Sequence, residues 1–115
     1  MPTYLSVMEN EIPLTSDDLM SYSKNKSSKL IVIDFKATWC VPCKAIKPFI
    51  EYLHESYPKV EFMEIDIEDE SRETIISNFN IKKVPTFVFY KNGEVCNTLV
   101  GTNKDNIECL VNDYL

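Results

Sequence analysis

Long apolar runs and a positive net charge are both missing from this sequence of 115 residues. The longest apolar stretches, at residues 30–33 and 86–90, are far shorter than the roughly 20 residues of a membrane-spanning helix. The 12 Lys and Arg residues are outnumbered by 18 Asp and Glu residues, which gives a net charge of −6. The short apolar stretches predict a protein that does not span a membrane. Because the phosphates of nucleic acids require a positive surface, we also expect no binding to nucleic acids.

A secretory signal is also missing. Residues 1–9 contain no basic start, no sustained apolar stretch and no small-residue cleavage site. We therefore expect a cytoplasmic protein, in a compartment that keeps thiols reduced. The length fits a single domain over residues 1–115, since the sequence shows no internal repeat, low-complexity tract or linker. A domain of this size buries roughly two-thirds of its unfolded surface, so its cysteines are not needed to staple it.

Strand and helix patterns alternate along the chain. Apolar or alternating segments predict strands at residues 4–7, 30–35, 60–67, 86–90 and 94–100. Capping residues and an apolar period of 3.6 predict helices at residues 16–25, 40–57 and 71–79 and after Asn103. Asn92 and Gly93 predict a tight hairpin turn between the last two strands. This order predicts a mostly parallel sheet with helices on both faces, closed by an antiparallel hairpin.

Two of the predicted helices have a clear apolar face. The helix that begins near residue 40 places four apolar side chains on one side: Ile46, Phe49, Ile50 and Leu53. The last helix does the same with a second set: Ile107, Leu110, Val111 and Leu115. Pro42 fits the first turn of its helix, where a missing N–H costs nothing. We expect both helices to pack these faces against the sheet.

Cys40 and Cys43 lie where the strand pattern gives way to the helix pattern, in the segment Trp39-Cys-Val-Pro-Cys43. A helix amino terminus carries a partial positive charge and unsatisfied N–H groups, and both favour a thiolate over a thiol. The thiolate is the nucleophile in disulfide exchange, so we expect Cys40, the first and more exposed sulfur, to attack. Cys43 lies one helical turn further in and is expected to resolve the mixed disulfide.

Two other uses of these cysteines stay open at this point. A structural zinc site needs four ligands, yet Cys96 and Cys109 fall thirteen residues apart on a predicted strand and helix, and His54 stands alone. We therefore expect no metal. Cys40 and Cys43 could also be inert core residues. Cys96 and Cys109 are interpreted as ordinary reduced thiols, with a regulatory or intermolecular disulfide as the alternative.

Several motifs resemble the thioredoxin family over nearly the whole chain. The matching stretches are residues 33–44 (Ile-Asp-Phe-Lys-Ala-Thr-Trp-Cys-Val-Pro-Cys-Lys), 46–48, 62–66, 84–86, 91–94 and 100–101. The resemblance implies one thioredoxin domain over residues 1–115, with an α/β thioredoxin fold. In that fold a central mixed β-sheet of four or five strands is flanked by helices on both faces. It also implies a monomer with no bound cofactor, protein disulfides as substrates, and electrons from a separate NADPH-dependent thioredoxin reductase.

Asp34 is an acid inside an otherwise apolar predicted strand. Burial of its charge is costly and should raise its pKa, which suits a group that exchanges a proton near neutrality. The resemblance places the matching carboxylate beneath the inner cysteine and gives it a part in proton transfer. The alternative is a polar core residue with satisfied hydrogen bonds.

The resemblance also implies a docking surface for substrate. It makes the Val84–Pro85 bond cis and lets Val84 pair with substrate backbone like an added strand. The residues expected on this surface are Trp39, Val41, Pro42, Val84, Pro85, Thr86 and Gly101. The alternatives are a core tryptophan and a plain turn proline. Gly101 is one of only two glycines, which suits a position that needs no side chain.

Three positions depart from the family pattern. Val41 stands where thioredoxins usually carry glycine, and its stiff apolar side chain bears on docking, reduction potential and the direction of electron flow. Glu64 stands where bacterial relatives have a lysine, and Lys36 where many members have a second tryptophan. The leading hypothesis is a disulfide reductant. A thioredoxin-like adaptor with little turnover, and an oxidant or isomerase, are the alternatives.

Overall fold

The computed structural model describes residues 13–26 and 28–115 and places four strands in one mixed sheet of order β2-β1-β3-β4. Strand β1 (Ile31–Lys36) pairs in parallel with β2 (Glu61–Asp66) and antiparallel with β3 (Thr86–Lys91). Strand β4 (Glu94–Val100) pairs antiparallel with β3 and forms one edge. The expected mixed sheet is therefore confirmed. The strand predicted at residues 4–7 lies outside the described residues.

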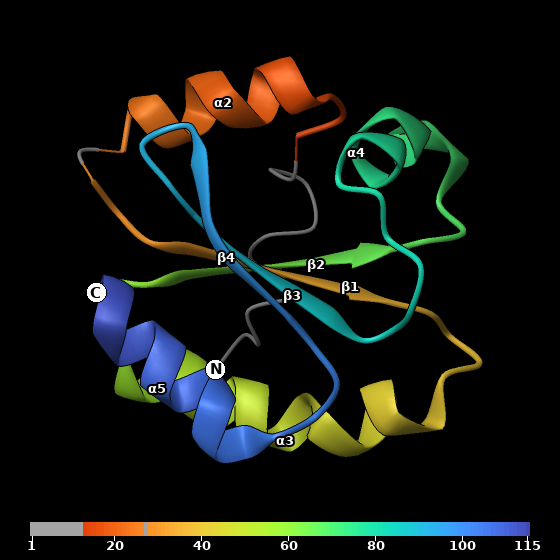
Figure 1. Cartoon of the computed structure of the whole chain (residues 1–115), viewed down its shortest axis with the longest axis vertical. Helices are drawn as coiled ribbons and strands as arrows, with labels where there is room; N and C mark the ends of the chain where they lie inside the picture. Colours follow the sequence, from red (N-terminus) through yellow and green to blue (C-terminus); the bar gives the residue numbers. More distant parts are fainter. Residues whose placement is uncertain (1–12, 27) are drawn as a thin grey trace.

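Helices cover both faces of this sheet, as expected. Helix α2 (Ser16–Lys24) and helix α4 (Glu73–Asn78) lie on one side (Figure 1). Helix α3 (Val41–Ser56) and helix α5 (Lys104–Tyr114) lie on the other. Within the described residues, none of the helices combines the length and the apolar character that crossing a bilayer requires.

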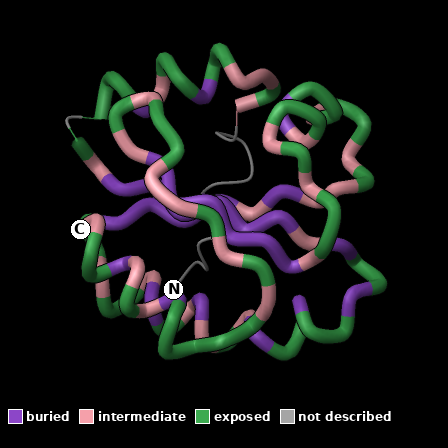
Figure 2. The backbone as a smooth tube through the Cα atoms, viewed as in Figure 1, coloured by how far each residue is buried: buried purple, intermediate pink, exposed green. Residues whose placement is uncertain are grey.

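The sheet separates two apolar cores, and β1, β2 and β3 are the most buried part of the molecule (Figure 2). Along β1, Val32 faces the core beneath α3 and α5, whereas Ile31, Ile33 and Phe35 face the core beneath α2 and α4. This alternation follows from the period of two in a strand. Since both faces are covered, β1 is apolar nearly throughout, as its sequence predicted.

Helix α3 confirms the predicted apolar face, because Ile46, Ile50 and Leu53 are buried. Two other helix predictions need correction. The helix predicted at 71–79 begins as a 3-10 turn, η1 (Glu70–Arg72), since the Asp69 side chain accepts the Ser71 N–H and fixes a tighter first turn. Leu115 is 58% exposed, because α5 ends one residue before it.

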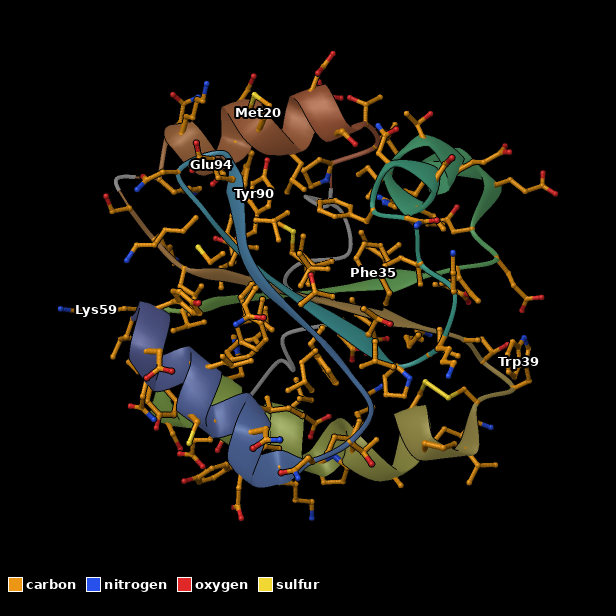
Figure 3. The ribbon with its side chains drawn as sticks, viewed as in Figure 1. Met20, Phe35, Trp39, Lys59, Tyr90 and Glu94 are labelled. Atoms are coloured by element: carbon orange, nitrogen blue, oxygen red, sulfur yellow. A yellow bond between two sulfur atoms is a disulfide. The ribbon has the colours of Figure 1, made fainter. Side chains whose placement is uncertain are left out.

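The hairpin between β3 and β4 is anchored on α2. Asn92 and Gly93 both have positive φ angles, +55° and +79°, which fits the predicted tight turn. The Gly93 N–H donates to the Oγ of Ser23, a fully buried side chain of α2, at 3.0 Å. Figure 3 shows Met20 of α2 beside the hairpin strand that carries Glu94. A Cβ at Gly93 would lie 3.1 Å from the Cγ of Met20, so the turn packs closely against the helix.

Replacement of Gly93 by alanine is predicted to lower the free energy of unfolding by about 1–2 kcal/mol, because an L-residue is strained at this φ. Chemical denaturation of the two proteins measures the difference. Gly93→Asn is the matched control, since it adds the same Cβ but tolerates positive φ, and should lose less stability. Equal stability of Gly93→Ala and the parent would contradict this account.

Candidate active site

Cys40 and Cys43 form a disulfide in the structure, with their Cα atoms 5.3 Å apart. Cys40 lies between the carboxyl end of β1 and the amino end of α3, and Cys43 lies in the first turn of α3. Figure 3 shows the sulfur–sulfur bond at this end of α3, close to Trp39. The structure thus brings together the two cysteines that the sequence predicted as the reacting pair.

The sulfur of Cys40 caps helix α3. Cys40 occupies the N-cap position, and its Sγ accepts the backbone N–H of Cys43 at 3.2 Å. Ser, Thr, Asp or Asn usually fills this position with an oxygen acceptor. The first turn of α3 contains no acidic residue, so the positive end of the helix dipole acts on the sulfur without a competing anion in that turn. This arrangement stabilises negative charge on Cys40.

The expectation that Cys40 is the more exposed cysteine is wrong for the disulfide form. Cys40 is 4% exposed and Cys43 is 7% exposed. The disulfide and a small cluster with Ala37 and the partly buried Ile67 and Val84 hold both side chains inward. The surface around them is instead apolar, because Trp39 is 62% exposed and Val41 is 72% exposed.

The loop before β3 faces the disulfide. Its Val84–Pro85 bond is cis, as the resemblance implied. The Val84 carbonyl oxygen lies 3.7 Å from the Sγ of Cys40, and the Gly101 N–H donates to the Pro85 carbonyl at 3.0 Å. Gly101 has a φ of +107°, and apart from its chain neighbours no described residue has an atom within 4 Å of the place where a Cβ would stand. Open space therefore adjoins the loop at Gly101.

Two expected docking residues behave differently from each other. Pro42 is exposed in the first turn of α3, next to Val41. Thr86 is only 3% exposed, and its hydroxyl donates to the Lys83 carbonyl at 2.6 Å. The hydroxyl of Thr86 thus holds the loop in place, and a docking role for this residue stays a prediction.

Asp34 is buried on the α3 side of the sheet. It follows Val32 by two residues, and Val32 belongs to the core beneath α3, so the two side chains share a face. Asp34 is 5% exposed, and its Oδ1 has no hydrogen-bond partner among the described residues. Burial is the main cause that raises the pKa of Asp34 to about 8, and the charge of Glu64 adds to it. Lys36 and Lys47 act in the opposite direction.

Lys36 and Glu64, two departures from the family pattern, form an ion pair. Their Nζ and Oε1 atoms are 3.4 Å apart. Glu64 stands directly opposite Asp34 in the parallel register of β1 and β2. Sequence reasoning singled out both residues but missed their pairing, because the register of strands thirty residues apart is not visible in either segment. The pair places a cation beside the one acidic neighbour that raises the pKa of Asp34.

An open cleft of about 320 Å³ leads to Cys43. Its lining consists of Lys36, Ala37, Thr38, Cys43, Lys44, Lys47 and Glu64. Cys43 therefore borders a solvent-accessible space on the side where Asp34 is buried. Three lysines line the cleft, and their positive charge favours a thiolate over a neutral thiol at Cys43.

The other two cysteines lie apart from this site. Cys96 is a free, partly buried thiol in β4, and burial raises its pKa. Cys109 is a free thiol on the exposed side of α5. Within residues 13–26 and 28–115, no three His, Cys, Asp or Glu side chains gather in a way that could hold a metal ion.

Comparisons with known proteins agree with this geometry. The family model described as Thioredoxin matches residues 12–113. The chain is 47% identical over 91 residues to a thioredoxin of Ophiophagus hannah, which covers 79% of this chain and 85% of that protein. It is 44% identical over 87 residues to the thioredoxin of Homo sapiens, which covers 76% of this chain and 81% of that protein.

Solved structures show the same likeness in three dimensions. Fasciola hepatica thioredoxin aligns with a TM-score of 0.79 and 31% identity, over 89% of this chain and 96% of that chain. Plasmodium falciparum thioredoxin aligns with a TM-score of 0.74 and 32% identity, over 90% of this chain and 97% of that chain. Both cysteines are present and bonded, so the adaptor alternative is not favoured. The chain belongs to the thioredoxin family and is a thiol–disulfide oxidoreductase.

Proposed function

We propose that the protein works as a reductant of protein disulfides, with Cys40 as the nucleophile and Cys43 as the resolving cysteine. The observation that carries this assignment is the Cys43 N–H directed at the Cys40 sulfur at the start of α3. A thiolate of Cys40 keeps this hydrogen bond and the helix dipole, whereas Cys43 lies inside the first turn. The asymmetry makes Cys40 the attacking sulfur.

The reaction proceeds in two exchanges. The Cys40 thiolate attacks one sulfur of a substrate disulfide, a mixed disulfide forms, and the first substrate thiolate leaves with the electron pair. Cys43 then gives up its proton and attacks the Cys40 sulfur, which releases the second substrate thiolate. The protein dithiol becomes the disulfide of the structure, and two electrons pass to the substrate.

Asp34 is proposed to take the proton of Cys43. The buried carboxyl group lies on the same side of the sheet as α3, and the cleft that Cys43 borders gives solvent access to that side. Its raised pKa lets the carboxyl group accept and return a proton near neutral pH. We infer that Lys36 offsets the effect of Glu64 and keeps this pKa within reach of neutrality.

Substrate docking is proposed to use the apolar lip of Trp39, Val41 and Pro42 together with the cis-proline loop. The exposed side chains of Trp39 and Val41 support a contact with apolar substrate surface. The Val84 carbonyl beside the sulfur, and the open space at Gly101, support pairing with an extended substrate backbone. Such pairing recognises backbone and leaves side-chain choice to neighbouring surfaces.

Thioredoxins generally work with disulfide substrates and a thioredoxin reductase. We propose that the electron donor here is an NADPH-dependent thioredoxin reductase and that the protein acts as a monomer in the cytoplasm. The free thiols of Cys96 and Cys109 support a reducing compartment.

Replacement of either active cysteine is predicted to abolish turnover in different ways. With insulin and dithiothreitol, Cys40→Ser should lose catalysed reduction and trap nothing. Cys43→Ser should also lose turnover, and once it is pre-reduced and freed of dithiothreitol it should accumulate a mixed disulfide with insulin, because no second thiol is left to resolve it. Turbidity measures the rate, and mass spectrometry without reductant detects the trapped species. A Cys40→Ser protein as active as the parent would remove Cys40 from the role proposed here.

Replacement of Asp34 by asparagine is predicted to slow the second exchange by at least about tenfold at neutral pH, because a proton acceptor is lost. Rapid mixing of the fully reduced protein with a substrate disulfide whose two thiols can be told apart follows both exchanges, and the release of the second thiol measures this step. The first exchange, at Cys40, should change much less. Equal rates for both steps in the two proteins would contradict a role for Asp34 in proton transfer.

The stability of the same variant provides the control for folding. The folded pKa of Asp34 is about 8, above the value of about 3.9 in an unfolded chain, so the parent loses stability as the pH rises through this window. Asparagine carries no buried charge. The free energy of unfolding of Asp34→Asn should therefore exceed that of the parent by more than about 1 kcal/mol at pH 9. This difference should shrink towards pH 4. A gap that widens at low pH would contradict the raised pKa.

A further inference from the structure

The edge of the sheet next to the cis-proline loop contains a hollow with no assigned role. Strand β4 places Thr98 opposite Val88 and Val100 opposite Thr86. Val88 belongs to the core beneath α2 and α4, so Thr98 and Val100 face that side of the sheet. A hollow of about 390 Å³ opens there between β4 and the loop that joins α4 to β3. Figure 1 shows this loop and β4 flanking β3.

The hollow combines apolar walls with a basic rim. Phe79, Ile81 and Val100 line it, and Val100 is 57% exposed. Lys82 and Lys83 form the rim, and both side chains are exposed. In the part of the chain that the structure describes, neither lysine forms an ion pair. In a chain of net charge −6, two neighbouring cations without acidic partners mark a local positive surface.

The hollow adjoins the docking residues along the chain. Lys83 precedes Val84, whose carbonyl oxygen lies 3.7 Å from the Cys40 sulfur. Val100 precedes Gly101, whose N–H is bonded to Pro85. An extended chain advances about 3.3 Å per residue. A substrate strand that pairs with Val84 therefore brings one of its side chains to the hollow, and that side chain lies within about three residues of the substrate's reacting cysteine.

A second hollow, beside η1 and α4, has the opposite charge. It is lined by Ile67, Ile76 and four acidic residues between positions 68 and 73. Ile67 also packs against the cysteine cluster, so this acidic surface reaches the site from another direction. An acidic substrate segment is repelled there and attracted to Lys82 and Lys83. The two hollows therefore carry opposite charge.

We propose that the hollow between residues 79–83 and β4 is a specificity subsite for the disulfide substrate. It takes an apolar side chain, flanked by Asp or Glu, from the extended segment next to the reacting cysteine. The proposal rests on the function proposed above and adds the class of substrate segment that this protein prefers. The apolar walls bind the side chain, and the lysine rim selects the neighbouring carboxylates.

The experiment uses the reduced Cys43→Ser protein and short peptides with one cysteine. Each peptide thiol is linked as a disulfide to 2-nitro-5-thiobenzoate. The Cys40 thiolate attacks the peptide sulfur, the bond between that sulfur and the chromophore breaks, and the coloured thiobenzoate thiolate leaves with the electron pair. Absorbance gives the rate constant. A protein with both Cys40→Ser and Cys43→Ser gives the background from Cys96 and Cys109.

Each series consists of three peptides that differ only at a site centred two residues from the cysteine. In one series this site lies on the amino side of the cysteine, and in the other it lies on the carboxyl side. The acidic peptide has leucine between two aspartates, the basic peptide has leucine between two lysines, and the glycine peptide keeps the aspartates without leucine. In one of the two series the acidic peptide should react about tenfold faster than the basic one at low salt, and 1 M salt should remove the difference.

Charge reversal identifies the rim. Lys82→Glu and Lys83→Glu should each lower the acidic-to-basic ratio by about threefold or more. Lys59→Glu is the matched control, because Lys59 precedes β2 at the opposite end of the parallel strands and lies far from Trp39 in Figure 3. It should leave the ratio unchanged. Thr98→Phe, which fills the hollow from β4, should remove the advantage of leucine over glycine.

The outcomes separate the two proposals. Two results would overturn the subsite. One is the same acidic-to-basic rate ratio in Lys82→Glu, Lys83→Glu and Lys59→Glu, and the other is an equal rate for all peptides at low salt. In both cases Cys40 still reacts, so the proposed function stands. Preference for the basic peptide would overturn the subsite too and would indicate that the acidic hollow receives the substrate. A lack of reaction at Cys40 with every peptide would instead overturn the proposed function.

Discussion

The hydrogen bond from the Cys43 N–H to the Cys40 sulfur is the interaction on which the site depends. It makes a sulfur the N-cap of α3, in a place where most helices use an oxygen. The same geometry determines the spacing of the motif, since two intervening residues bring the second cysteine within one helical turn of the first. The rest of the fold holds this helix end in position. Strand β1 delivers the chain to it, and the cis-proline loop closes the opposite side.

The buried carboxyl group in β1 is the second constraint. A central strand covered on both faces is a costly place for an ionisable side chain, and the neighbouring Glu64 increases that cost. The ion pair between Lys36 and Glu64 limits the increase. The environment of Asp34 thus favours its neutral, protonated form. The neighbouring charges of Glu64 and Lys36 shift the equilibrium between its protonated and ionised forms in opposite directions. This is the kind of site in which a carboxyl group serves proton transfer at a cost in stability.

Much of this arrangement could be predicted from the sequence because its signals are local. The apolar character of β1, the buried face of α3 and the turn at Asn92 and Gly93 follow from residues close together in the chain. The cis bond at Pro85 was available only through the family resemblance, since the local sequence is compatible with either isomer.

Other features depend on contacts between distant segments and could not be predicted. The Lys36–Glu64 pair requires the register of β1 and β2, and the low exposure of Cys40 requires contacts with Ile67 and Val84. Thr86 faces inward because its hydroxyl closes a turn with Lys83. The roles of the individual site residues and the single domain over residues 1–115 stay predictions. What the fold adds to the motif is therefore a set of charges and surfaces around two cysteines.

The rate of alkylation at Cys40 tests the central claim most directly. In fully reduced, folded protein, iodoacetamide reacts with thiolates, and the exposed Cys109 of α5 serves as an internal reference. The account predicts that mass-spectrometric mapping at pH 7 finds Cys40 modified well before Cys109. It also predicts that the rate at Cys40 reaches half its maximum at least one pH unit below the value of about 8.5 for free cysteine. A Cys40 that reacts no faster than Cys109, with a half-maximum at or above 8.5, would contradict it.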